Sequence, residues 1–178
     1  ALAAGHPPGP LTAGPDDNCV IPYSSGTTGN PKGCVHTHHS AMATTVYCSV
    51  WGNAQHDSVQ LVSVPMFHVT GMQVCMNGAI YIGGTQVVMT RWDRKVAAQL
   101  IQDHRITGWR NISTMVVDLL SEPTIDDYDL SSLEVITYGA ASMPLEVIKR
   151  AIAEFPGARF INAFGQTETA STITMLPP

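Results

Sequence analysis

The chain has 178 residues and a formal net charge of −5, with 44 % hydrophobic and 13 % charged residues. The negative charge and the lack of any Lys/Arg cluster argue against a nucleic-acid-binding surface. The apolar stretch at residues 69–88 is interrupted by Gln73, Asn77, Gln86 and four glycines, so a membrane span is not expected.

The order of predicted elements indicates the fold class. Residues 1–17 contain four prolines and three glycines, which predict a loop-like lead-in. After them, β-branched runs predict strands at residues 18–22, 59–64, 85–90, 106–109, 133–138 and 159–164. Helical spacing predicts helices at residues 39–51, 70–82, 93–104, 113–120 and 144–155, with Asp93 as an N-cap. This alternation predicts an α/β fold, with a mainly parallel sheet and helices on its faces.

The run YSSGTTGNPKG at residues 23–33 puts four Ser/Thr hydroxyls, three glycines and one lysine into a single predicted loop. Glycine lets the backbone turn tightly, and successive N–H groups can then form an anion-binding concavity. The run is not a Walker A loop, because Lys32 is followed by Gly33 and not by Ser or Thr. A flexible linker is the alternative, but a linker needs neither the PKG ending nor the flanking strand and helix. We therefore predict a phosphate-binding loop.

Three further segments follow predicted strands in the same way, at residues 65–71, 138–144 and 164–168. In open α/β sheets, ligands bind beyond the carboxyl ends of the strands. We therefore expect all four segments to open on one edge of the sheet and to form one composite site.

These four segments resemble, in order, the motifs of the adenylate-forming superfamily, which includes acyl-CoA synthetases, adenylation domains of peptide synthetases and luciferases. Residues 23–33 resemble its phosphate-binding signature, and PMFHVTG at 65–71 resembles the segment with its active-site histidine. YGAASMP at 138–144 resembles its adenine-side loop, and NAFGQTET at 162–169 resembles its aromatic-Gly-x-Thr-Glu motif. The fatty-acid–CoA ligase branch is the most similar, chiefly through FHVTGM at residues 67–72.

The resemblance implies ATP-dependent activation of a carboxylic acid through an acyl-adenylate, followed by transfer to coenzyme A. A fatty acid is the expected substrate, and Mg²⁺ the expected metal ion. The residues that the resemblance assigns to nucleotide binding are Ser24, Ser25, Gly26, Thr27, Thr28, Gly29, Lys32, Gly139, Ala140, Ala141, Asn162, Phe164, Gly165 and Thr167. Those it assigns to catalysis are His68, Lys32, Thr167 and Glu168, and Glu168 is also the expected Mg²⁺ contact.

Some of these residues also have plainer interpretations. His68 in isolation would be a core histidine, Glu168 a solvated turn carboxylate and Phe164 a core aromatic; the motif context favours function for each. Phe164 stands where the family usually has tyrosine, which preserves stacking but removes a hydroxyl. A zinc site at residues 36–39 is not expected, because no cysteine or carboxylate cluster stands at matching spacing. Those side chains are expected to cap a helix or face solvent.

Members of the superfamily are several times longer than this chain. Residues 18–178 are therefore expected to be a partial AMP-binding domain of a larger cytoplasmic enzyme, and the four cysteines to be reduced thiols. The ribose-binding aspartate, the hinge and the C-terminal domain with its catalytic lysine are expected elsewhere in that parent, so the chain alone is expected to be inactive. Two alternatives stay open. One is a ligase for an aromatic or other acid, or a peptide-synthetase adenylation domain; the other is a truncated nucleotide-binding module without activity.

Overall fold

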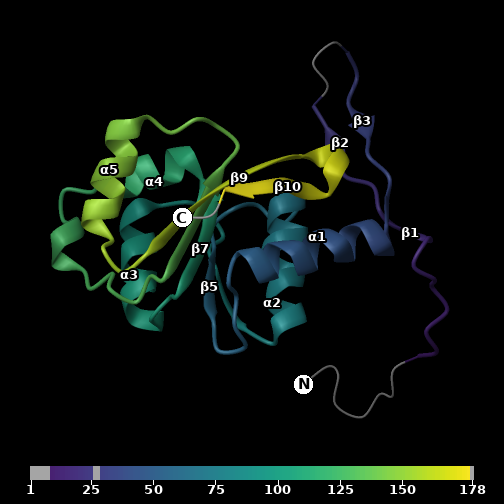
Figure 1. Ribbon diagram of the computed structural model, residues 1–178, viewed down its shortest axis with the longest axis horizontal. Coiled ribbons are helices and arrows are strands. Elements are labelled where there is room, and N and C mark those ends of the chain that lie inside the picture. The colour runs from purple at the N-terminus through teal and green to yellow at the C-terminus, as the bar shows by residue number, and fades with distance from the viewer. Residues whose placement is uncertain (1–8, 26–28, 177–178) are drawn as a thin grey trace.

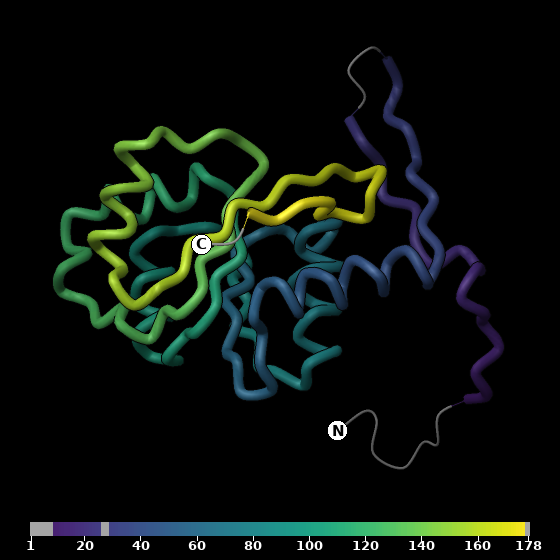
Figure 2. Tube along the Cα trace, viewed as in Figure 1, coloured from purple at the N-terminus to yellow at the C-terminus, as the bar shows by residue number. Residues whose placement is uncertain are grey.

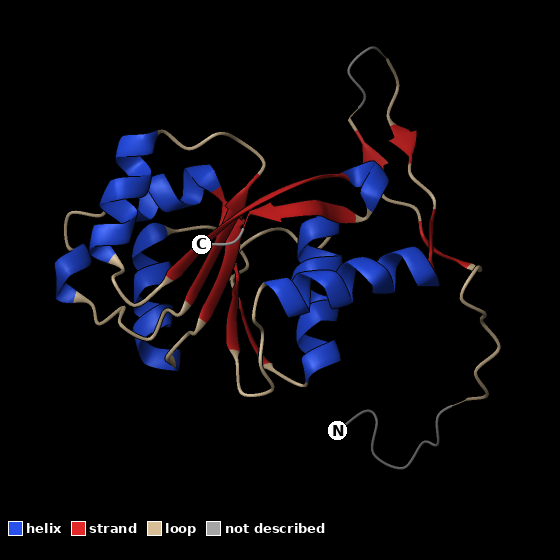
Figure 3. Cartoon of the chain, in the orientation of Figure 1, coloured by secondary structure: helices blue, strands red, loops and turns tan. Residues whose placement is uncertain are grey.

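A six-stranded sheet forms the centre of the molecule, and helices lie on both of its faces (Figure 3). The computed structural model describes residues 9–25 and 29–176. The strand order is β10-β9-β8-β7-β5-β6. Its strands are β5 (Val59–Val62), β6 (Thr85–Val88), β7 (Gly108–Ile112), β8 (Val135–Gly139), β9 (Arg159–Gln166) and β10 (Ser171–Leu176). Strands β5 to β9 run parallel to one another, and β10 is antiparallel to β9. This arrangement confirms the predicted α/β fold.

The helices divide between the two faces of the sheet (Figure 1). One face is covered by α1 (His38–Trp51), the π-helix η1 (Thr70–Met76) and α2 (Asn77–Ile82). The other is covered by α3 (Arg94–His104), α4 (Ser113–Leu120) and α5 (Leu145–Glu154). Short 3₁₀ turns form η2 (Ile125–Asp127) and η3 (Thr167–Thr169). Among the helices of the described residues, none is long and apolar enough to cross a bilayer.

Side-chain caps explain where two of the helices begin. Oδ1 of Asp93 accepts hydrogen bonds from the N–H groups of Lys95 (2.9 Å) and Val96 (3.0 Å), as expected for the N-cap of α3. Thr37 caps α1 in a reciprocal box with Ser40. For most strands of the sheet and most helices, the boundaries predicted from the sequence agree with the structure to within a few residues.

Three predictions about elements were wrong or incomplete. Residues 18–22 do not join the sheet, because β1 (Asn18–Val20) pairs antiparallel with β4 (His36–Thr37). Pro22 cannot donate a hydrogen bond and closes that short run, and its β-branched residues fit a two-stranded ribbon as well as a sheet. The helix predicted at 70–82 is two helices of different pitch, η1 and α2. The edge strand β10 was not predicted at all.

The larger hydrophobic core lies between the sheet and α3, α4 and α5. Trp109 on β7 is fully buried there and stacks on Trp92 with ring centroids 5.6 Å apart. The opposite face has a much smaller cluster around Val62, Val64 and Cys75. That face instead buries polar side chains, including Gln60, and this is where the candidate site lies.

Candidate active site

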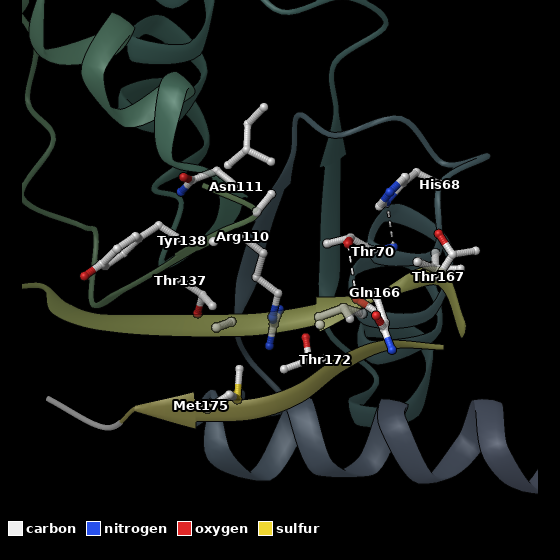
Figure 4. Close-up of a pocket in the computed structure, with 18 of the residues that line it drawn as sticks. His68, Thr70, Arg110, Asn111, Thr137, Tyr138, Gln166, Thr167, Thr172 and Met175 are labelled. Carbon is white, nitrogen blue, oxygen red and sulfur yellow. Dashed lines mark hydrogen bonds between the residues drawn. The ribbon is translucent and has the colours of Figure 1, made fainter. Parts of the chain in front are cut away.

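A cavity of about 310 Å³ opens at the carboxyl ends of β7 and β8 (Figure 4). Its other walls come from the segment that leads into η1 and from the β9–η3–β10 hairpin. The predicted site residues that line it are His68, Gly139, Ala140, Gly165, Thr167 and Glu168. Three of the four sequence segments therefore meet around one cavity.

His68 lies in the loop after β5 and is exposed at the cavity wall. The backbone N–H of Thr70 donates to its Nδ1 at 3.2 Å (Figure 4). Nδ1 is therefore the acceptor, and in the neutral imidazole the proton is on Nε2. The ring can offer this Nε2–H to an oxygen anion in the cavity.

The turn that holds Thr167 and Glu168 is fixed from two sides. Nε2 of His36, on β4, donates to the carbonyl oxygen of Thr167 at 2.7 Å, and the His36 side chain is 4 % exposed. Oγ1 of Thr44, on α1, donates to the carbonyl oxygen of Thr169 at 3.4 Å. The histidine run was expected to cap a helix or face solvent. That is correct for Thr37 but wrong for His36, which is buried because its ring reaches this carbonyl.

A side-chain hydrogen bond connects the His68 loop to the β9–η3–β10 hairpin. Oγ1 of Thr70 lies 3.1 Å from Oγ of Ser171, the first residue of β10. Because Thr70 also fixes the His68 ring, a change in β10 can reach His68 through only two hydrogen bonds. Neither Thr70 nor Ser171 was predicted as a site residue.

The segment after β8 has a backbone that tolerates little change. A Cβ at Gly139 would lie 2.2 Å from the carbonyl oxygen of Ala163 on the neighbouring strand, so only glycine fits. Ala140 has a φ of 66°, in the left-handed region. Oγ of Ser113, the first residue of α4, donates to the carbonyl oxygen of Ala141 at 2.7 Å and fixes the segment after β8. Gly139 and Ala140 line the cavity, whereas Ala141 does not.

The phosphate-loop residues lie outside this cavity. The expectation that they extend from the same sheet edge was wrong, because β2 (Tyr23–Ser24) and β3 (Lys32–Gly33) form a separate antiparallel hairpin. Figure 2 shows the described parts of this hairpin projecting beyond the sheet. Its base contacts η3, next to Thr167. Ser24, Ser25, Gly29 and Lys32 do not line the cavity, and Gly26, Thr27 and Thr28 lie outside the described residues.

The two other nucleotide-binding predictions also fall outside the cavity lining. Phe164 is 61 % exposed, and Asn162 is half-buried on the same strand, β9. The cavity is instead lined by three buried polar residues that the sequence did not single out: Arg110, Asn111 and Thr137. Polar residues within strands that are otherwise apolar were the sequence signal that could have indicated these positions.

Comparison with known proteins decides the family. A model of the AMP-binding enzyme family matches residues 3–178. The chain belongs to the AMP-binding enzyme family. The long-chain-fatty-acid–CoA ligase of Bacillus subtilis is 32 % identical over 160 residues, which are 89 % of this chain and 28 % of that protein. The 4-coumarate–CoA ligase 1 of Solanum tuberosum is 32 % identical over 166 residues, which are 90 % of this chain and 30 % of that ligase.

Solved structures of AMP-binding enzymes agree with the fold. The inhibitor-bound N-terminal domain of FACL13 from Mycobacterium tuberculosis superposes with a TM-score of 0.88 at 27 % identity. The match covers 96 % of this chain and 42 % of that structure. This AMP-binding chain thus spans less than a third of the curated relatives named above and less than half of that solved domain.

Proposed function

We propose that this chain supplies the acid- and nucleotide-binding surface of an AMP-forming acid–CoA ligase. The observation that supports it best is the meeting of His68, Thr167 and Glu168 around one cavity, beside the Gly139–Ala140 backbone. These residues come from segments about 100 positions apart, and each lies in a motif typical of the family. A ligand held between them would contact an imidazole, a hydroxyl and a carboxylate at once.

In the first step, a carboxylate oxygen of the acid attacks the α-phosphorus of ATP. The P–O bond to pyrophosphate breaks, and the products are an acyl-adenylate and pyrophosphate. Nε2–H of His68 orients the attacking carboxylate, and the hydroxyl of Thr167 binds the α-phosphate. Lys32 offsets part of the negative charge of the β- and γ-phosphates, and the Ser/Thr hydroxyls of residues 23–33 donate hydrogen bonds to them. The site thereby contributes positioning and electrostatic stabilisation of the transition state.

Glu168 is suited to share a Mg²⁺ ion with the nucleotide. Its carboxylate lies exposed at the cavity and takes part in no ion pair among the described residues. Mg²⁺ is commonly held by one or two carboxylates together with phosphate oxygens and water, so one free carboxylate fits this role. When bound, the ion would offset the negative charge of the phosphates.

In the second step, the thiol of coenzyme A attacks the acyl carbon and AMP leaves. We assign no residue of this chain to coenzyme A.

Two acid classes are candidates. The FHVTGM run and the Bacillus relative support a fatty acid, and Val69, Val74, Ile112 and Met175 give the cavity an apolar wall. An aromatic acid is the second candidate, because the 4-coumarate–CoA ligases are equally similar. Both classes present one carboxylate and an apolar body.

The test is to incubate the longest protein that contains these residues with ATP, Mg²⁺, coenzyme A and one acid at a time. Hexanoate, hexadecanoate and 4-coumarate cover the candidates. Mass spectrometry should find the CoA ester and AMP in equal amounts. Calorimetric binding of ATP·Mg²⁺ without AMP release for any acid would indicate the nucleotide-binding module instead, and ADP as the product would contradict the proposal.

A further inference from the structure

Arg110 is a buried cation without an anionic partner among the described residues. It lies on β7, is 5 % exposed, and belongs to none of the ion pairs in that part of the chain. Nη1 donates to Oε1 of Gln60 at 2.7 Å, but the buried Nε–H has no acceptor within residues 9–25 and 29–176. Burying a charge without an opposite charge is costly, so such a group calls for an explanation.

The neighbouring strand places a second unsatisfied group next to it. Arg110 and Thr137 are paired in the parallel register of β7 and β8, so their side chains project from the same face. Oγ1 of Thr137 is buried and also lacks a hydrogen-bond partner in the part of the chain that the structure describes. Both residues line the cavity that His68 and Thr167 line. In Figure 4, the Arg110 guanidinium lies between Thr137 and Thr172, with His68 and Thr167 on one side.

Two thiols on the helices that cover this face, Cys48 of α1 and Cys75 of η1, are close enough to Arg110 to feel its charge, but they do not compensate it. Burial raises the pKa of the Cys75 thiol to about 11 and also raises the pKa of Cys48, so both thiols are uncharged near neutral pH. The third unsatisfied atom, Oδ1 of Asn111, is an acceptor on the opposite face of the strand and does not serve an anion.

We propose that the acid activated at this site has a second carboxylate, which accepts hydrogen bonds from Nε–H of Arg110 and from the hydroxyl of Thr137. The inference rests on the proposed ligase function and replaces the two monocarboxylic candidates with a short dicarboxylic acid. One carboxylate faces His68 and reacts, and the other neutralises the buried arginine. The cavity volume of about 310 Å³ is at the lower end of small-molecule sites, which favours a short chain.

This arrangement predicts selection between acids of equal length. A monocarboxylic acid leaves the guanidinium buried without an anion, whereas a dicarboxylic acid gains two hydrogen bonds, at least one of them charge-assisted. Since hydrogen bonds to charged groups are worth about 1.5–3 kcal/mol, we expect hexanedioate to exceed hexanoate in kcat/KM by roughly tenfold to a hundredfold.

The experiment compares hexanedioate with hexanoate, and octanedioate with octanoate, by ATP–pyrophosphate exchange on the longest protein that contains this chain. Arg110→Met removes the charge at similar length and should lower the diacid-to-monoacid ratio at least tenfold. Gln60→Glu leaves Arg110 in place and offers it an internal carboxylate at the existing hydrogen bond. It should lower the same ratio while the melting temperature is kept or raised. Thr137→Val should lower the ratio by a smaller factor.

The possible outcomes separate this inference from the proposed function. If the protein gives ATP–pyrophosphate exchange with none of these acids, both the inference and the proposed function are overturned. Exchange that favours the monoacids, with a ratio unchanged in Arg110→Met, would overturn the second carboxylate and leave the ligase function standing. If Arg110→Met weakens ATP binding by the same factor with every acid, the arginine serves the nucleotide. That result would also overturn the second carboxylate. If Arg110→Met does not fold, the Gln60→Glu and Thr137→Val ratios decide the question.

Discussion

At the scale of single residues, His36 shows how a side chain outside the cavity can control it. Its imidazole and the Thr167 carbonyl are 131 positions apart in the sequence, yet they form a partly buried hydrogen bond of 2.7 Å. The bond fixes the backbone from which Thr167 and Glu168 project. His36 touches no substrate in this account and acts only by positioning that turn.

We predict that His36→Leu lowers kcat for adenylate formation by about tenfold or more while the KM for ATP changes less. The Thr167 carbonyl would lose its partner in a partly buried place, which costs about 1 kcal/mol of folding stability. His36→Gln is the matched control, because its amide can donate to the same oxygen and should restore part of kcat at similar stability. Equal kcat in the leucine variant and the wild type would contradict the positioning role.

The residues that line the cavity could be predicted from the sequence only where a local motif marks them. His68, Thr167, Glu168 and Gly139 lie in short runs that resemble motifs of the adenylate-forming superfamily, and the structure places all four at one cavity. The importance of His36 and Arg110 depends on partners in other elements, so no local pattern could reveal it.

At the scale of elements, the close approach of β8 and β9 is the most restrictive feature of the site. A Cβ on Gly139 would meet the carbonyl of Ala163, which belongs to the backbone and cannot rotate away. The strands would have to separate where the cavity forms.

We therefore predict that Gly139→Ala lowers the free energy of unfolding by at least about 2 kcal/mol, as expected for forced backbone movement in a packed sheet. Gly157→Ala is the matched control, because its nearest neighbour would be the Leu133 carbonyl oxygen at 3.9 Å, an ordinary contact. Urea unfolding of both variants checks the prediction. Similar unfolding midpoints for the two would show that β8 and β9 are packed less tightly than described.

The parallel strands and most helices were predictable because each has a clear apolar period or an end signal such as Asp93. Two elements were missed for different reasons. The run at 18–20 fits a ribbon or a sheet equally well, and only its pairing with β4 settles which one forms. The strand β10 alternates Thr with apolar residues, and that signal was available.

At the scale of the whole molecule, the buried thiol of Cys75 makes folding stability depend on pH. Burial raises its pKa from the ordinary 9.0 to about 11. Between these values the unfolded chain releases the thiol proton and the folded chain retains it, so rising pH favours the unfolded state. Below pH 9 the thiol is protonated in both states and contributes no slope.

We predict that the free energy of unfolding falls between pH 9 and pH 11 and that Cys75→Ala flattens part of this fall. The alanine variant should be less stable at every pH, because it leaves a small cavity. Urea titrations at pH 8, 9, 10 and 11 measure the slope. A slope identical in both proteins would show that other groups produce the dependence.

The account as a whole holds that the loop after β5 and the η3 turn form one acid-activating site. Acid-dependent ATP–pyrophosphate exchange tests this most directly, because it reports adenylate formation without coenzyme A. It should be run on the longest protein containing these residues, as wild type and as His68→Ala. We predict that exchange requires an added acid and that the alanine variant is at least about tenfold slower, with an unfolding free energy within about 0.5 kcal/mol of the wild type. Exchange at the same rate in both proteins, or none with any acid from a folded protein, would contradict the account.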